Sequence, residues 1–362
     1  MRRHDAAVSI AALTVVAAAW AGPALAYDGW HLEHAVTLDG KGAGWDYVSF
    51  DQGTAHVFLG HRKEGLQVYD PKTMTIVKVV AGTAEASSNG AVLIPELDLG
   101  VSNNENGTLI PFKLSTLEAQ PAIKVGEDLD TSHYDAASKK LVLNMGAGKD
   151  GTELIMLDVP SMKEAGRLKV ASKKVEGADS DGKSAFYMAA QDIDKLYKID
   201  VAAGKMTAEY DTGPSCGRPT AVTVETASDR VFVSCRGHDA IKPSLTVFDG
   251  ASGRTVYSAE IGGGTDSVIY DAELKRIFSA NGVSANLNVF EQDGPDSYKP
   301  VETLGTRAGM RTMAMDHKSK TIYAVTAEGT ADPSKKILTA VSPFYANTIF
   351  PNTFTVLTYG KP

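Results

Sequence analysis

Charged side chains return at one position of a repeated unit in this 362-residue chain. Asp46, Asp130, Glu176 and Asp266 each lie five residues before an aspartate that closes a predicted strand, and Arg311 occupies the same position. Carboxylates gathered at one place suit a hard cation such as calcium, which takes about 6–8 oxygen ligands and could polarise a lactone or ester carbonyl. A guanidinium instead suits an anion. The same layer therefore supports two chemistries, anion binding and metal-assisted hydrolysis.

Further polar side chains come at the end of a predicted second strand or just before a first strand, so we expect them around the same layer. These residues are His61, Asn103, Asn144, Arg218, Arg236 and Asn281. With the charged layer they would form a polar ligand-binding site. The alternative is structural, because strand-end Asp and Asn side chains commonly bond to neighbouring units. The H-E-x-x-H signature of zinc hydrolases does not occur in the sequence.

The elements that would carry these side chains repeat about every 44 residues. Each unit contains four short runs with alternating apolar and polar residues, separated by turn formers, as in residues 220–261. The residues that close the first run are 40 to 46 positions apart: Asp51, Pro95, Asp135, Asp181, Glu225, Asp271 and Asp316. This period predicts an all-β fold, a seven-bladed β-propeller of four-stranded antiparallel blades. The first strand of each blade would then line a central channel, with the charged layer at its mouth.

Both ends of the repeat depart from the pattern. The seventh unit is one strand short, and an extra alternating run, residues 30–39, precedes the first unit. We expect this N-terminal strand to close the ring, because an unclosed ring leaves an open sheet edge. The last unit also contains a long insertion at residues 327–353, which would either pack on the closing seam or cover the channel mouth as a lid.

The second strands carry a sequence signature as well. Val101-Ser102-Asn103-Asn104 is similar to a Tyr-Val-Thr-Asn run, and residues 311–316 and 354–357 look like the final blade of secreted propellers. Over residues 27–362 the chain resembles the YVTN-repeat, YncE-like β-propellers, in their secreted bacterial branch. The resemblance implies a secreted seven-bladed propeller. Such propellers include binding proteins, a single-strand DNA binder and lactone hydrolases, so the fold leaves the activity open.

Residues 1–26 predict a secretory signal peptide. Arg2 and Arg3 precede an apolar run at residues 6–21, and residues 24–26 form an A-x-A cleavage site. The run is short for a membrane span of roughly 20 residues. We therefore expect a mature, periplasmic or secreted protein of residues 27–362 with no membrane span. In that oxidising compartment Cys216 and Cys235, the two cysteines of the chain, are expected to form a disulfide.

The sequence favours a monomeric binding or scaffold protein over an enzyme. Its polar channel mouth would bind a small molecule, a peptide or a protein. A net charge of −8 disfavours a nucleic-acid partner, which would require clustered basic residues. The alternative is a metal-dependent, lactonase-like hydrolase that holds calcium or another divalent cation at Asp46, Asp130, Glu176 and Asp266.

Overall fold

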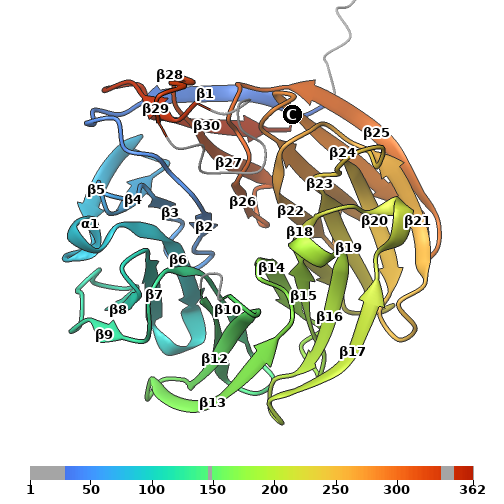
Figure 1. Ribbon diagram of the computed structural model, residues 1–362. Coiled ribbons are helices and arrows are strands. Elements are labelled where there is room, and N and C mark those ends of the chain that lie inside the picture. Colours follow the sequence, from blue (N-terminus) through green and yellow to red (C-terminus); the bar gives the residue numbers. More distant parts are fainter. Residues whose placement is uncertain (1–28, 146–148, 336–345, 362) are drawn as a thin grey trace, which may run out of the picture.

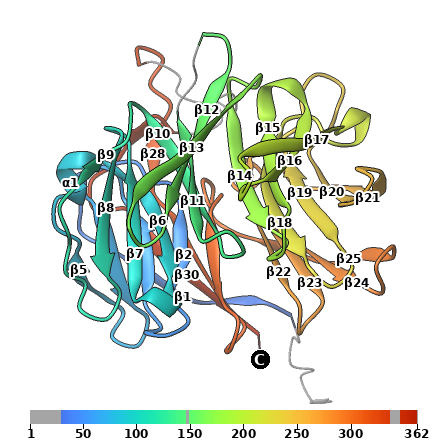
Figure 2. The same ribbon diagram turned by 90° about the horizontal axis from the view of Figure 1, so that it is seen from below.

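The chain folds into a ring of small β-sheets around a common central axis (Figure 1). A computed structural model describes residues 29–145, 149–335 and 346–361, so the predicted signal peptide lies outside the described residues. The described residues form seven four-stranded antiparallel sheets and one separate two-stranded sheet. This confirms the prediction of an all-β, seven-bladed propeller. Figure 2 shows the same ring from the side.

In blades 1–6 the strand order follows the chain from the channel outward, because each strand pairs with the next through a short turn. Blades 1–3 consist of β2 (Val48–Phe50), β3 (Val57–Gly60), β4 (Leu66–Asp70) and β5 (Thr75–Val79); β6 (Ser88–Ile94), β7 (Leu99–Asn104), β8 (Thr108–Lys113) and β9 (Ile123–Lys124); and β10 (Leu129–Asp135), β11 (Lys140–Met145), β12 (Thr152–Asp158) and β13 (Lys163–Val170). Blades 4–6 consist of β14 (Val175–Ser180), β15 (Phe186–Ala190), β16 (Lys195–Asp200) and β17 (Lys205–Asp211); β18 (Pro219–Glu225), β19 (Arg230–Cys235), β20 (Ser244–Asp249) and β21 (Thr255–Glu260); and β22 (Thr265–Asp271), β23 (Arg276–Asn281), β24 (Asn286–Gln292) and β25 (Tyr298–Gly305).

Blade 7 combines strands from both ends of the described chain. Its order is β26 (Met313–Asp316), β27 (Thr321–Thr326), β30 (Thr355–Gly360) and then β1 (His31–Thr37). The insertion forms a hairpin of β28 (Gly329–Thr330) and β29 (Thr348–Ile349). The described helices are one-turn pieces between strands: α1 (Thr83–Ala86) and the 3₁₀ turns η1 (Pro95–Leu97), η2 (Gln191–Ile193) and η3 (Gly213–Ser215).

Ring closure by the N-terminal strand is confirmed. β1 pairs antiparallel with β30 from His31–Gly360 to Thr37–Thr355, and the hydroxyls of the last pair lie 3.0 Å apart. Just before β1, the buried Trp30 ring packs edge-on against Phe278 of blade 6, with centroids 5.0 Å apart. The closing strand therefore completes blade 7 and also seals the boundary with its neighbour.

The core lies between the blades, where the faces of adjacent sheets meet. The middle strands are buried almost throughout, whereas outer strands such as β17 alternate between exposed and half-buried residues. Aromatic rings cross the boundaries, as for Phe58 and Phe112 between blades 1 and 2 and Phe232 and Tyr270 between blades 5 and 6. A four-stranded sheet cannot bury its own faces, so each blade depends on the blade at either side.

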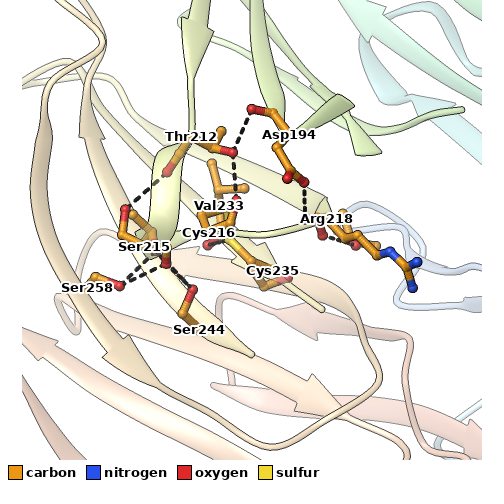
Figure 3. Close-up of a disulfide and its surroundings, with 12 residues drawn as sticks. Asp194, Thr212, Ser215, Cys216, Arg218, Val233, Cys235, Ser244 and Ser258 are labelled. Atoms are coloured by element: carbon orange, nitrogen blue, oxygen red, sulfur yellow. Dashed lines mark hydrogen bonds between the residues drawn. A yellow bond between two sulfur atoms is a disulfide. The ribbon is translucent and has the colours of Figure 1, made fainter. Parts of the chain in front are cut away.

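A disulfide joins Cys216 to Cys235, as predicted (Figure 3). Cys216 lies in the loop that enters blade 5, Cys235 ends β19, and their Cα atoms are 5.3 Å apart. The loop is also held by hydrogen bonds, since the Thr212 hydroxyl donates to the Cys216 carbonyl at 2.6 Å and Ser215 accepts at its carbonyl from Ser244 at 2.6 Å. A disulfide is compatible with an extracellular or periplasmic protein. Within the described ranges, no helix is long and apolar enough to cross a membrane.

We expect removal of the closing strand to destabilise the whole ring. A chain that starts at Gly40 loses β1 and exposes the edge of β30, so it should aggregate or lose its cooperative thermal transition. A milder variant, Trp30→Ala, should lower the free energy of unfolding by about 3–5 kcal/mol, because it empties a buried aromatic site. The measurement is thermal and denaturant unfolding, with a chain that starts at Gly29 as control. Equal melting of the two truncated chains would show that β1 does not close the ring.

Candidate functional site

The predicted layer of charged residues converges on the channel. The innermost strands surround the centre of the ring in Figure 1. Asp46, Asp130 and Asp266 belong to blades 1, 3 and 6. In addition to burial, the charges of Asp130 and Asp266 raise the pKa of both Asp46 and Glu176, so these acids lie near one another. The repeat position therefore brings the acidic residues together in space, as the periodicity predicted.

One half of the layer is a chain of ion pairs that runs from blade 1 through blade 7 to blade 6. Asp46 accepts from Arg62 at 2.7 Å, and its second oxygen lies 3.6 Å from Arg311. Arg311 donates through Nε to Asp266 at 2.9 Å, and the other oxygen of Asp266 accepts from Arg236 at 2.5 Å. Three guanidiniums thus hold two carboxylates that are themselves buried. Pairs of this kind fix geometry, because each carboxylate would be costly to bury alone.

The other half is centred on Lys174, which lies between blades 3 and 4. Its ammonium contacts Asp130 directly and lies 3.4 Å from Glu176. Glu176 is buried and also accepts from the Gln191 amide at 3.1 Å, which in turn lies 3.0 Å from the Thr220 hydroxyl. One ammonium therefore lies beside two carboxylates, and Glu176 has the neutral Gln191 amide as a second polar partner.

Burial dominates the acid–base properties of the layer. It raises the pKa of Asp46 against the opposing effect of Arg62 and Arg311, and it raises the pKa of Glu176 to about 7. Burial alone would lower the pKa of Lys174, but the nearby Glu176 and Asp130 outweigh it and raise that pKa. Tyr47 also faces these acids, and burial followed by their charges raises its phenolic pKa well above 10.0. Glu176 is therefore the group of this layer poised to exchange a proton near neutral pH.

Several predicted site residues lie in the ties between blades. Asn103 donates to the Asp130 carbonyl at 2.8 Å, Asn144 donates to the Val175 carbonyl at 2.6 Å, and both side chains are buried. Asn281 is buried too and bonds within its own blade, to Asn286 at 2.9 Å and Asn288 at 2.8 Å. His61 stacks on Phe354 with centroids 3.7 Å apart. The contacts of Asn103 and Asn144 join neighbouring blades, as the structural alternative expects, whereas Asn281 bonds inside its own blade.

Arg218 touches the charged layer through its backbone. Its backbone N–H donates to Asp194 at 2.7 Å, and in Figure 3 its guanidinium points away from Asp194 and from the disulfide. Asp194 also pairs with His238 of the next loop, at 2.7 Å. The carbonyl of Arg218 accepts from the backbone N–H of Arg236, which pairs with Asp266, so Arg218 adjoins one end of the ion-pair chain.

Sequence reasoning missed Lys174, although a signal was available. Lys174 stands two residues before Glu176, and residues two apart point to one side of an extended chain. The partner of Arg62 on its outer side, Glu105, was also missed. The two residues are 43 positions apart, about one repeat, because each follows the second strand of its blade.

A large pocket opens beside the ion-pair chain, between blades 1 and 7. Its volume is about 890 Å³. One wall belongs to the channel mouth and the other to the insertion, so the insertion packs at the seam and also shapes the mouth. The lining residues are Gly42, Gly44, Trp45, Arg62, Glu105, Arg307, Ala308, Gly309, Arg311, Thr326, Ala327, Glu328, Gly329, Lys335, Ala346, Asn347, Thr348, Ile349, Phe350 and Thr353.

Trp45 joins the pocket to the charged layer. Its ring is buried, and the Arg311 guanidinium lies over it at 5.3 Å from the centroid while donating to the Trp45 carbonyl at 2.8 Å. A cation held over an indole face in this way is orientationally fixed. In contrast, the acidic layer itself offers no assembled metal centre: among the described residues, no three His, Cys, Asp or Glu side chains are grouped so that they could hold a metal ion.

Comparison with known proteins identifies the fold and no family. No family model and no curated protein matches the sequence. Similar solved structures include a chain of the mitotic checkpoint complex, with a TM-score of 0.69, 12% identity and coverage of 88% of this chain and 95% of that one. The WD40 repeats of RRP9 give 0.70, 7%, 90% and 97%, and hydrazine synthase of Kuenenia stuttgartiensis gives 0.66, 12%, 79% and 94%. At these identities the similarity shows a shared propeller architecture.

Arg311→Ala should destabilise the protein by about 2–4 kcal/mol at pH 7, because it leaves Asp46 and Asp266 close together with one cation fewer. The loss should be smaller at pH 4, since the pKa of Asp46 is raised and its protonation removes the repulsion. Denaturant unfolding at both pH values measures it. Arg167→Ala is the matched control, because Arg167 pairs with two glutamates on the surface and should contribute under about 1 kcal/mol. Equal losses for the two variants would contradict a buried ion-pair chain.

Glu176→Gln should stabilise the protein at pH 8 and leave it unchanged near pH 4.5. The folded-state pKa of about 7 exceeds the ordinary 4.5, so stability from protonated Glu176 is present below pH 4.5 and is lost as the pH rises through 7. Gln mimics the protonated acid, and Lys174 keeps Asp130 as partner. We expect a gain of about 1–3 kcal/mol at pH 8 in denaturant unfolding.

The exposed Glu118→Gln serves as the control for this effect and should show no such pH dependence. If Glu176→Gln is less stable than the wild type at pH 8, the carboxylate is stabilising in its charged form and the assignment is wrong.

Proposed function

We propose that the protein is a periplasmic or secreted binding protein that holds a small molecule or peptide at the mouth of its central channel. The observation that carries the proposal is the pocket of about 890 Å³ between blades 1 and 7. Ligand sites in proteins are clefts of roughly 300–1,000 Å³ with a few polar groups on a mostly apolar lining. This pocket combines fixed arginines, Trp45 and a second wall from the insertion, so it has the features of such a site.

The rigidity of the inner wall supports binding. Arg62 and Arg311 are each held by two carboxylates, so their positions are set before a ligand arrives. Preorganised groups lose little conformational entropy on binding. The outer wall consists of the β28–β29 hairpin, which the propeller repeat does not require. A segment added to one blade at the channel mouth is well placed to define a ligand.

The proposal also covers the location of the protein and its relatives. We propose that residues 1–26 direct secretion and that the chain is a divergent relative of the YVTN-repeat propellers. The solved propeller of the mitotic checkpoint complex belongs, by its name, to an assembly, so a protein partner at this mouth is the broader form of the proposal. Metal-assisted hydrolysis has less support, because Asp46, Asp130, Glu176 and Asp266 all contact basic side chains that compete with a cation.

The pocket can be tested by filling it. Ala308 lines the pocket and is exposed, so Ala308→Trp should place an indole in the pocket without disturbing the core. Equilibrium dialysis against a mixture of small carboxylates, phosphate esters, amines, alcohols and dipeptides, read by mass spectrometry, should show saturable binding of at least one compound by the wild type.

Ala308→Trp should weaken that binding at least tenfold, whereas Ala203→Trp, at an exposed turn between β16 and β17, should leave it unchanged. No bound compound, or binding that both variants leave intact, would refute the pocket as the functional site.

A further inference from the structure

The charged groups around the pocket are unevenly divided. Four basic side chains line it, against two acidic ones, in a protein whose net charge is −8. The basic residues come from blade 1, from the loop before blade 7 and from the insertion, so they surround the pocket from several sides. A local excess of positive charge on an acidic protein attracts anions to that place.

Two of the four basic residues are already paired within the propeller. Arg62 contacts Asp46 and Glu105, and Arg311 contacts Asp46 and Asp266. The carboxylate of Glu105 that lines the pocket is itself bound by Arg62 and by the Ser87 hydroxyl. These groups set the shape and polarity of the inner wall, but their charges are largely balanced by one another.

The other two basic residues, Arg307 and Lys335, are balanced differently. Both are exposed, and no carboxylate of the described residues lies within ion-pair distance of either one. The ammonium of Lys335 contacts only a neutral group there, the Thr348 hydroxyl at 2.7 Å. The exposed Glu328 lines the pocket and Asp332 acts on Lys335 at longer range, so these acids offset part of the positive charge, but among the described residues no carboxylate is in contact with Arg307 or Lys335. They are the groups from which a ligand can gain charge-assisted hydrogen bonds.

Part of the remaining lining is apolar. Ala308, Ala327 and Ile349 line the pocket, and Phe350 at its edge exposes 44% of its surface. An exposed aromatic ring beside basic groups suits a ligand that has both an apolar body and a charged end. A purely inorganic anion would leave this surface unused.

We propose that the pocket binds a small organic anion, with its carboxylate or phosphate group at Arg307 and Lys335 and its apolar body against Ile349 and Phe350. This inference rests on the proposed function and names the class of its ligand. It assigns the specificity of the site to the insertion and the loop before blade 7, and the buried ion-pair chain supplies only the fixed wall.

The test compares ligands of one shape and different charge. Benzoate and phenyl phosphate should bind at least tenfold more tightly than benzyl alcohol and benzylamine in calorimetry at pH 7.5. Their affinity should fall when NaCl is raised from about 50 to 300 mM, because salt screens exposed charges. The double variant Arg307→Gln/Lys335→Gln should weaken anion binding at least tenfold, and Arg307→Glu/Lys335→Glu should favour benzylamine over benzoate.

The matched control removes the same charge elsewhere. Arg254→Gln/Lys205→Gln changes two exposed basic residues beside the turns between third and fourth strands, and should alter affinity less than twofold. If compounds bind in a manner that Ala308→Trp blocks but the anions have no advantage, the pocket is functional and the anion inference is wrong. If Ala308→Trp blocks the binding of no compound, the proposed function fails and this inference fails with it.

Discussion

The pairing of β1 with β30 is the interaction on which the rest of this structure depends. Each four-stranded blade buries its two faces only against its neighbours, so the core is continuous only when the ring is closed. The closing pair joins residues at positions 37 and 355, whose hydroxyls are 3.0 Å apart. The channel, its mouth and the pocket at the seam all exist because this one pair holds blade 7 against blade 1.

Closure also brings together like charges that repel one another. Innermost strands begin at one end of the channel, so the repeated acidic position places Asp46, Glu176 and Asp266 within reach of one another. Basic side chains on the adjoining loops then compensate them. Arg62 and Arg236 come from loops between the second and third strands of their blades, and Lys174 comes from the loop that enters blade 4. The result is a polar rim whose side chains are held by ion pairs. Such a rim can form one wall of a binding site, whereas its basic side chains compete with a metal cation for the carboxylates.

The fold followed from the sequence because it depends on local, repeated information. Alternation at period two and markers 40 to 46 residues apart predicted the blades, and a missing strand predicted closure. The disulfide followed from there being two cysteines in a chain with a predicted signal peptide. The site was less predictable. Asn103 and Asn144 have the same residue type whether they face a ligand or tie two blades, and only the path of the neighbouring backbone decides. The pocket depends on how residues 327–353 fold back, and no repeat constrains that segment.

The large sequence separation between the closing strands has a consequence for the order in which the protein folds. Thr37 and Thr355 are 318 residues apart, so the contact that completes the ring has a very high contact order. Six blades can form from neighbouring hairpins while the chain is still being made, but the seventh waits until β30 is available. The pocket lies at that same seam. The proposed binding site is therefore completed together with the ring, and a ligand that fills the pocket would by mass action favour the fully assembled chain.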